Sequence, residues 1–271
     1  MRARFYLALP LLVCCVFVGA VSAHFHTFWP DSPNGYGRPG QRVSWQYFWG
    51  HPYELIIFDA REPNVRAVTP DGGTVQLTPE PTEVRDPATG STRRAFTFSY
   101  TPEALGDTWI VLEAPPLPIE EEGEAVKDYV KQCVHVMAER GWDEPVGLPV
   151  EMVPLTRPYG LEEGFAFTAR ALLNGEPLPD AAVEIEKFNG FYVDEEMLPT
   201  DQFGTEDVPM ITRAAKTDAG GYVTATLDEP GWWVISVSAE SGTVSLEGET
   251  YPRVLRGCLW VHVEKKLTLE K

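Results

Sequence analysis

The chain has 271 residues, of which 44% are hydrophobic and 11% are aromatic, enough to bury the core of two ordinary domains or one large one. Its formal net charge of −18 excludes a surface built to hold nucleic acid or anionic lipid head groups. We interpret most of the carboxylates as a solvated acidic surface that keeps the protein in solution.

The first 23 residues have the pattern of a secretory signal. Two arginines precede an apolar run at residues 5–20, and small residues then lead up to Ala23. The run is short for a membrane-spanning helix, which argues against a retained anchor. A retained anchor, or a lipoprotein modified at Cys14, is the alternative. We expect cleavage after Ala23, a mature chain that begins at His24 and a periplasmic or otherwise secreted location, without direct membrane insertion. Loss of the two arginines takes the formal net charge from −18 to −20.

Short β-rich runs follow one another through the first part of the mature chain. They lie at residues 42–47, 55–58, 95–100, 109–113 and 129–137. Turn signals rich in Gly, Pro and Asp separate them. Short strands at such close spacing predict a β-sandwich rather than a sheet covered by helices.

Residues 141–164 contain too many prolines and glycines for a regular element, and we predict a domain boundary there. A second strand series follows at residues 165–169, 183–186, 222–227, 232–237 and 259–263, with a long acidic loop at residues 189–209. The order of its strands and turns resembles that of the immunoglobulin-like or transthyretin-like modules of exported proteins. This likeness implies no chemistry. The prediction is therefore an all-β chain: a cleaved signal peptide (1–23) and two β-sandwich domains in tandem (24–155 and 156–271).

Two of the four cysteines leave with the signal, so Cys133 and Cys258 remain in an oxidising compartment. We expect a disulfide between them. In the chain-entropy model, a disulfide that closes the long loop between these two positions stabilises the fold by roughly 4–5 kcal/mol. A pair of thiolate metal ligands is the alternative.

Cleavage after Ala23 would place His24-Phe25-His26 at the mature N-terminus. A free amine, two deprotonated amides and the His26 imidazole can form a square-planar set of four nitrogens, which suits Cu(II) or Ni(II). Alternatively, His24 chelates an ion through its amine and imidazole, and another histidine completes the site. The two modes compete for the amine. In an extended strand His24 and His26 point to the same face, roughly 6.5–7 Å apart. We predict both as metal ligands; two histidines left beside a cleavage site by chance are the alternative.

Two further histidines are candidate ligands. His51 lies between Gly50 and Pro52 in a turn after an aromatic strand, where Glu54 could orient its second ring nitrogen. An ordinary turn histidine is the alternative. His135 is either a further ligand or a half-buried strand residue.

Motifs of catalysis are missing from the sequence, which has neither Gly-x-Ser-x-Gly nor His-Glu-x-x-His. We predict that the protein is not an enzyme. Trp45, Tyr47, Phe48 and Trp49 could line a sugar platform, but at alternating strand positions such residues are more often core. A metal-independent binding or adhesion module for a protein or glycan is the second hypothesis, and a copper-dependent redox enzyme built on His24 is the third.

Several motifs are spread along nearly the whole mature chain. They are Ala-His-Phe-His-x-Phe-Trp-Pro at 23–30, Gly-His-Pro-Tyr-Glu at 50–54, Gly-Trp-Asp at 141–143, Glu-Met-Val-Pro-Leu at 151–155 and Pro-Gly-Trp-Trp at 230–233. Together they resemble the NikM/NikK-type exported nickel-transport family. The resemblance implies a periplasmic accessory that binds Ni(II), with Co(II) or Cu(II) as alternatives, for the membrane components of an energy-coupling-factor type metal importer. By motif, its metal ligands would be His24, His26 and His51, in that order, followed by His135.

Overall fold

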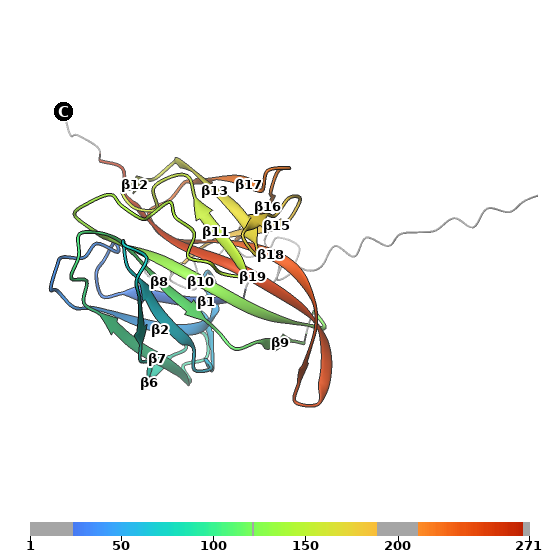
Figure 1. Cartoon of the computed structure of the whole chain (residues 1–271). Helices are drawn as coiled ribbons and strands as arrows, with labels where there is room; N and C mark the ends of the chain where they lie inside the picture. The colour runs from blue at the N-terminus through green and yellow to red at the C-terminus, as the bar shows by residue number, and fades with distance from the viewer. Residues whose placement is uncertain (1–23, 121, 189–210, 268–271) are drawn as a thin grey trace, which may run out of the picture.

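The computed structural model describes residues 24–120, 122–188 and 211–267 (Figure 1). These residues form strands and no helix, so the all-β prediction is confirmed. In the same ranges there is consequently no helix that could span a membrane. The predicted signal peptide and the predicted acidic loop at 189–209 lie outside the described residues.

The first sheet contains five strands and is built entirely from the first part of the chain. Its order is β1 (Phe25–Pro30), β2 (Val43–His51), β7 (Thr92–Tyr100) and β6 (Glu80–Arg85), with β3 (Ile56–Phe58) also paired to β2. Since β1 pairs only with β2 in this sheet, the segment that carries His24 and His26 lies at a sheet edge.

The second sheet contains ten strands and runs through the centre of the molecule. Its order is β16 (Thr212–Lys216), β15 (Ala182–Lys187), β18 (Gly231–Leu246), β19 (Glu249–Glu264), β10 (Glu124–Val136), β8 (Gly106–Glu113), β4 (Asn64–Val68) and β5 (Thr74–Leu77), with β9 (Leu117–Ile119) and β12 (Leu161–Glu162) off this path. Strands β10 and β19 pair in parallel, from Ala125 opposite Arg253 to Gln132 opposite Trp260. The central sheet therefore joins strands from both sides of the predicted boundary at 155/156.

The third sheet is small and covers the other face of the central sheet. It consists of β11 (Val150–Pro154), β13 (Phe165–Leu173), β14 (Glu176–Pro177) and β17 (Tyr222–Leu227). Figure 1 shows β10 and β19 in the middle, with β1, β2, β6 and β7 on one side and β11, β13 and β17 on the other. The tip of the β18–β19 hairpin extends away from this body.

Two hydrophobic clusters fill the spaces between the three sheets. Because side chains alternate along a strand, neighbouring residues of the central sheet belong to different clusters: Ile110 packs toward the five-stranded sheet and Val111 toward the four-stranded one. The arrangement is two sandwiches that share one sheet. The aromatic run at Trp45, Tyr47 and Trp49 is buried in the first cluster, as expected of core residues.

The breaker-rich segment 141–164 differs from the prediction, because it contains strand β11. Pro149 precedes this strand and Pro154 ends it, so the four residues between them remain free to pair with β13. All residues of β11 are buried. A high proline content thus marked the ends of a core strand.

Candidate metal site at the start of β1

His24 and His51 lie opposite each other at the end of the β1–β2 ladder. The register pairs Phe25 with Gly50 and His26 with Trp49, so the next position outward brings the two imidazoles together. Their Nε2 atoms are 3.1 Å apart. Two nitrogens bound to one ion at about 2.0–2.1 Å lie roughly 2.9–3.4 Å apart, depending on the angle between them. The spacing therefore fits two ligands of a single metal ion, and in the absence of an ion it fits a hydrogen bond between the two rings.

A tight hairpin holds His51 in place. Strand β3 folds back on β2 and pairs Ile56 with His51. A Cβ at Gly50 would lie 2.0 Å from the Ile56 carbonyl oxygen, so this approach requires glycine. Glu54, predicted to orient His51, has its Oε2 3.9 Å from the His51 Nδ1. Its orienting role remains a prediction.

The His24 imidazole is packed among aromatic rings. It stacks on Trp49 and on Phe58, each with ring centroids 5.5 Å away. Burial, then the neighbouring His51 and the Arg256 charge, lower the pKa of His24 to about 3, against the opposing effect of Asp128. The ring is therefore neutral at pH 7, the state in which a histidine can bind a metal.

His26 shares the inward face of β1 with His24, as the strand spacing predicts, but its ring belongs to the core. Its Nδ1 is 2.7 Å from the Tyr47 hydroxyl, and its Nε2 lies 4.0 Å from Oδ2 of Asp128. Burial is the main cause that lowers the pKa of His26 to about 4. The square-planar mode would need the His26 imidazole, which here contacts Tyr47. The structure therefore does not bring His26 to the pair formed by His24 and His51.

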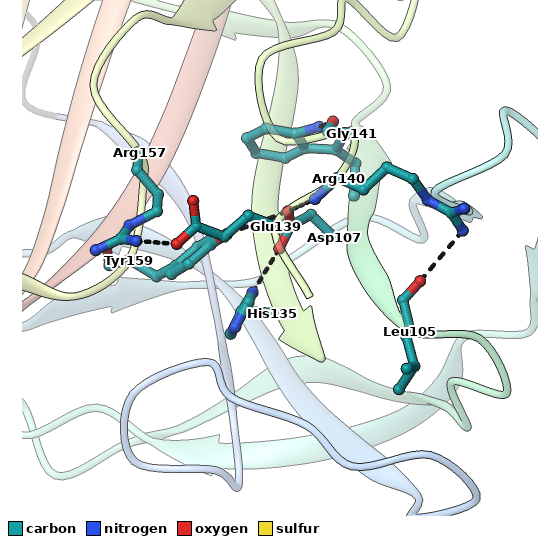
Figure 2. A network of polar contacts seen from close by, with 9 residues as sticks. Leu105, Asp107, His135, Glu139, Arg140, Gly141, Arg157 and Tyr159 are labelled. Atoms are coloured by element: carbon teal, nitrogen blue, oxygen red, sulfur yellow. Dashed lines mark hydrogen bonds and ion pairs between the residues drawn. The ribbon is translucent and has the colours of Figure 1, made fainter. Parts of the chain in front are cut away.

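His135 lies in a different part of the molecule, within the polar network that Figure 2 shows. It is seven positions along β10 from Asp128, the neighbour of His26, which corresponds to about 23 Å in a strand. Its Nδ1 is 2.7 Å from Oδ1 of Asp107, and its ring stacks on Tyr159 at 4.0 Å. The other Asp107 oxygen accepts bonds from the Arg140 backbone N–H and the Tyr159 hydroxyl. The structure thus separates His135 from the other three candidate ligands, His24, His26 and His51.

The predicted disulfide is not formed. Cys133 and Cys258 are both free and buried. Cys133 packs in the cluster beneath the four-stranded sheet and Cys258 in the cluster beneath the five-stranded one. Opposite faces of one sheet cannot present two sulfur atoms to each other. Burial raises the pKa of both thiols, which also disfavours the thiolate form that metal ligation needs.

Sequence reasoning missed a buried ion pair beneath His24. The Arg256 guanidinium binds the Asp128 carboxylate through Nε at 2.8 Å and Nη2 at 2.7 Å. The same Nη2 donates to the His24 carbonyl at 2.5 Å. The available signal was a charged residue inside an otherwise apolar strand run, but the partner lies 128 positions away.

Across the described residues, no group of three or more His, Cys, Asp or Glu side chains is placed to hold one metal ion. A metal at this site would therefore take two protein imidazoles, from His24 and His51. Further ligands would have to come from water or from the chain's own amine.

Comparison with known proteins identifies a family but no function. A family model described as a domain of unknown function, DUF4198, matches residues 21–241. No curated protein matches the chain.

Similar solved structures share little sequence with the chain. A DUF4785 family protein from Legionella pneumophila is 9% identical with a TM-score of 0.31, over 80% of this chain and 52% of its own. A Salmonella alpha-2-macroglobulin is 16% identical with a TM-score of 0.26, over 94% of this chain and 16% of its own. The D0–D1 domain of intimin is 9% identical with a TM-score of 0.23, over 88% and 97%. The chain thus spans about half of the first protein and a small part of the second.

Proposed function

The chain belongs to the DUF4198 family, whose function is unknown, and we propose from its own residues that it is an exported protein that binds a transition-metal ion between His24 and His51. The observation that carries the proposal is the 3.1 Å separation of the two Nε2 atoms. The lowered pKa of His24 supports it, since the ring needs no deprotonation before it binds.

Nickel is the ion that we propose first. Neutral imidazoles suit Ni(II), Cu(II) and Co(II), whereas Mg²⁺ and Ca²⁺ prefer oxygen ligands. Affinity in vitro should follow the general order Cu(II) above Ni(II) above Co(II). The choice of nickel as cargo comes from the motif resemblance to the NikM/NikK-type family, and so does delivery to the membrane components of an importer. In this account the protein carries the ion and catalyses no reaction.

The ring orientation favours two Nε2 ligands over chelation by the His24 amine. Chelation through the amine and the imidazole of one residue uses Nδ1, because only Nδ1 can close a small ring with that amine. His24 directs Nε2 at His51 instead. The square-planar mode is disfavoured as well, since it would take His26 away from Tyr47.

The test is calorimetric titration of Ni(II), then Cu(II) and Co(II), into protein whose first residue is confirmed as His24 by mass spectrometry. We expect one ion per chain, and equal affinity in a form with Gly-Ser added before His24. Binding lost on extension would move the ion to the amine and Nδ1 of His24 and overturn the two-Nε2 assignment. Absence of binding in both forms would overturn the metal function itself.

A further inference from the structure

The edge of β1 that does not pair with β2 accepts hydrogen bonds from side chains of the central sheet. Within the described residues, β2 is the only strand paired with β1, so the carbonyls on the other edge of β1 have no ladder partner. An edge of this kind is normally open to water or to another chain. Here three successive carbonyls of that edge accept side-chain hydrogen bonds. The donors are Arg256 Nη2 to His24 at 2.5 Å, Trp260 Nε1 to His26 at 3.1 Å and Gln132 Nε2 to Phe28 at 3.3 Å.

The three donors come from the two strands at the centre of the molecule. Arg256 and Trp260 lie four positions apart on β19, and Gln132 lies directly opposite Trp260 on β10. All three side chains are buried. The position of β1 over the central sheet is therefore set by groups that have little freedom of their own.

Arg256 differs from the other two donors because it is charged. Its guanidinium is bound twice by Asp128, which is itself completely buried, and it lies 5.1 Å from the centre of the Phe25 ring. Removing such a pair from water costs about as much as the attraction returns, so a buried ion pair is a weak source of net stability. The ion pair instead holds the guanidinium in one orientation, so that its Nη2 points at the His24 carbonyl.

We propose that Arg256, oriented by Asp128, is a positioning residue that fixes His24 for metal binding; this inference rests on the proposed function. His24 is the first residue of the predicted mature chain, and the ends of chains are poorly ordered unless they are tied down. The bond to its carbonyl fixes the backbone at His24. The ring is then directed at His51.

The test compares two matched substitutions on β19 in the mature protein. Arg256→Lys keeps the positive charge beside Asp128, but an ammonium cannot reproduce the fork that binds Asp128 and the His24 carbonyl together. Arg253→Lys is the control, because Arg253 contacts the carbonyl of Ser241 in the projecting hairpin. We expect Ni(II) affinity to fall about 10- to 100-fold in Arg256→Lys, the range found when partners of metal ligands are lost. Arg253→Lys should bind like the wild type.

A second readout separates positioning from general loss of structure. At saturating Cu(II), the electron paramagnetic resonance spectrum of Arg256→Lys should differ from that of the wild type, because His24 approaches the ion differently. Unchanged affinity and an unchanged spectrum would overturn the inference while leaving metal binding intact. A wild type that binds no metal would instead overturn the proposed function.

Asp128→Asn covers the case in which Arg256→Lys does not fold. It keeps the shape of the side chain but weakens the hold on Arg256, so a smaller loss of affinity in the same direction is expected. Folded Asp128→Asn protein with wild-type affinity would count against the positioning role.

Discussion

Two histidine sites, one around His24 and the other around His135, lie far apart and differ in what faces the ring nitrogen. Both rings are stacked on an aromatic side chain. The His24 Nε2 faces a second imidazole, whereas the His135 Nδ1 faces the carboxylate of Asp107. That carboxylate also accepts two other hydrogen bonds within a connected network (Figure 2).

Aromatic stacking is common to both sites, so it does not by itself identify a metal ligand. Asp107 on β8 contacts three groups: the His135 ring on β10, the Arg140 backbone N–H in the following loop and the Tyr159 hydroxyl, so its carboxylate connects these segments. At the first site the Nε2 atoms of the two imidazoles are 3.1 Å apart, a spacing at which the rings can form one hydrogen bond with each other or bind one ion between them. We therefore propose metal binding at the first site, where a second imidazole faces the ring, and structural support at the second.

Metal affinity should respond most strongly to substitution, and only at the site formed by His24 and His51. We expect His51→Ala to weaken Ni(II) binding by more than about 100-fold, because loss of a ligand should exceed the loss caused by removing a ligand's hydrogen-bond partner. His135→Ala should bind as the wild type does. Calorimetric titration of both variants checks this, and comparable losses in the two would remove the distinction between the sites.

The free energy of unfolding, by contrast, should depend on the network around His135. Asp107→Asn leaves at least one of the three donors without its charged acceptor, and we expect the free energy of unfolding to fall by about 1–3 kcal/mol. Metal affinity should not change. Urea denaturation of apo protein measures the effect, with Glu139→Gln, at an exposed ion pair with Arg157, as a control expected to have little effect. Equal midpoints for the two variants would show that the Asp107 network gives no structural support.

A third effect depends on pH and concerns the core histidine of β1. The pKa of His26 is about 4 in the folded chain against 6.5 in the unfolded chain. Between these values the unfolded state takes up a proton that the native ring does not. His26 therefore contributes stability that is complete above pH 6.5 and is lost as the pH falls toward 4, by up to about 1.4 kcal/mol per pH unit.

Glu184 changes stability with pH in the opposite sense to His26. Burial raises the pKa of its carboxyl to about 7, so this group favours the folded state as the pH falls. The measurement is therefore the difference between wild type and His26→Gln in the pH dependence of the unfolding free energy. The wild-type curve should fall more steeply below pH 6.5. Parallel curves would mean that His26 is not held neutral by the core.

The redox state of the solution should have little effect on the stability of the protein, because its two buried cysteines are free. Reductant should not change the melting temperature, and a thiol reagent should label two thiols per mature chain only after unfolding, because Cys133 and Cys258 are buried and face different clusters. A mass two hydrogens lower in the unreduced protein would contradict this.

Local patterns predicted the strands but not their arrangement. The alternation at Val183 to Glu186 is strand β15, and the run at 129–137 is most of β10. Parallel pairing of β10 with β19 joins segments more than 120 residues apart, and no local pattern encodes it. The proline-rich segment around β11 was misread because prolines flank a strand as readily as they interrupt one.

The candidate site was predicted in its residue types more than in its geometry. His24 and His51 were each suggested by a motif, but that they lie opposite each other follows from the β1–β2 register. The spacing of His24 and His26 gave the correct face, although packing against Tyr47 then placed His26 in the core. Arg256 was missed because its role depends on a partner across the central sheet.

X-ray absorption at the nickel edge reports which side chains bind the ion. Nickel-loaded mature protein should show scattering from two imidazoles, and nickel-loaded His51→Ala, prepared at a concentration high enough to saturate it, should show one fewer. A wild-type spectrum without imidazole scattering, or one that His51→Ala leaves unchanged, would contradict the assignment of the ion to His24 and His51.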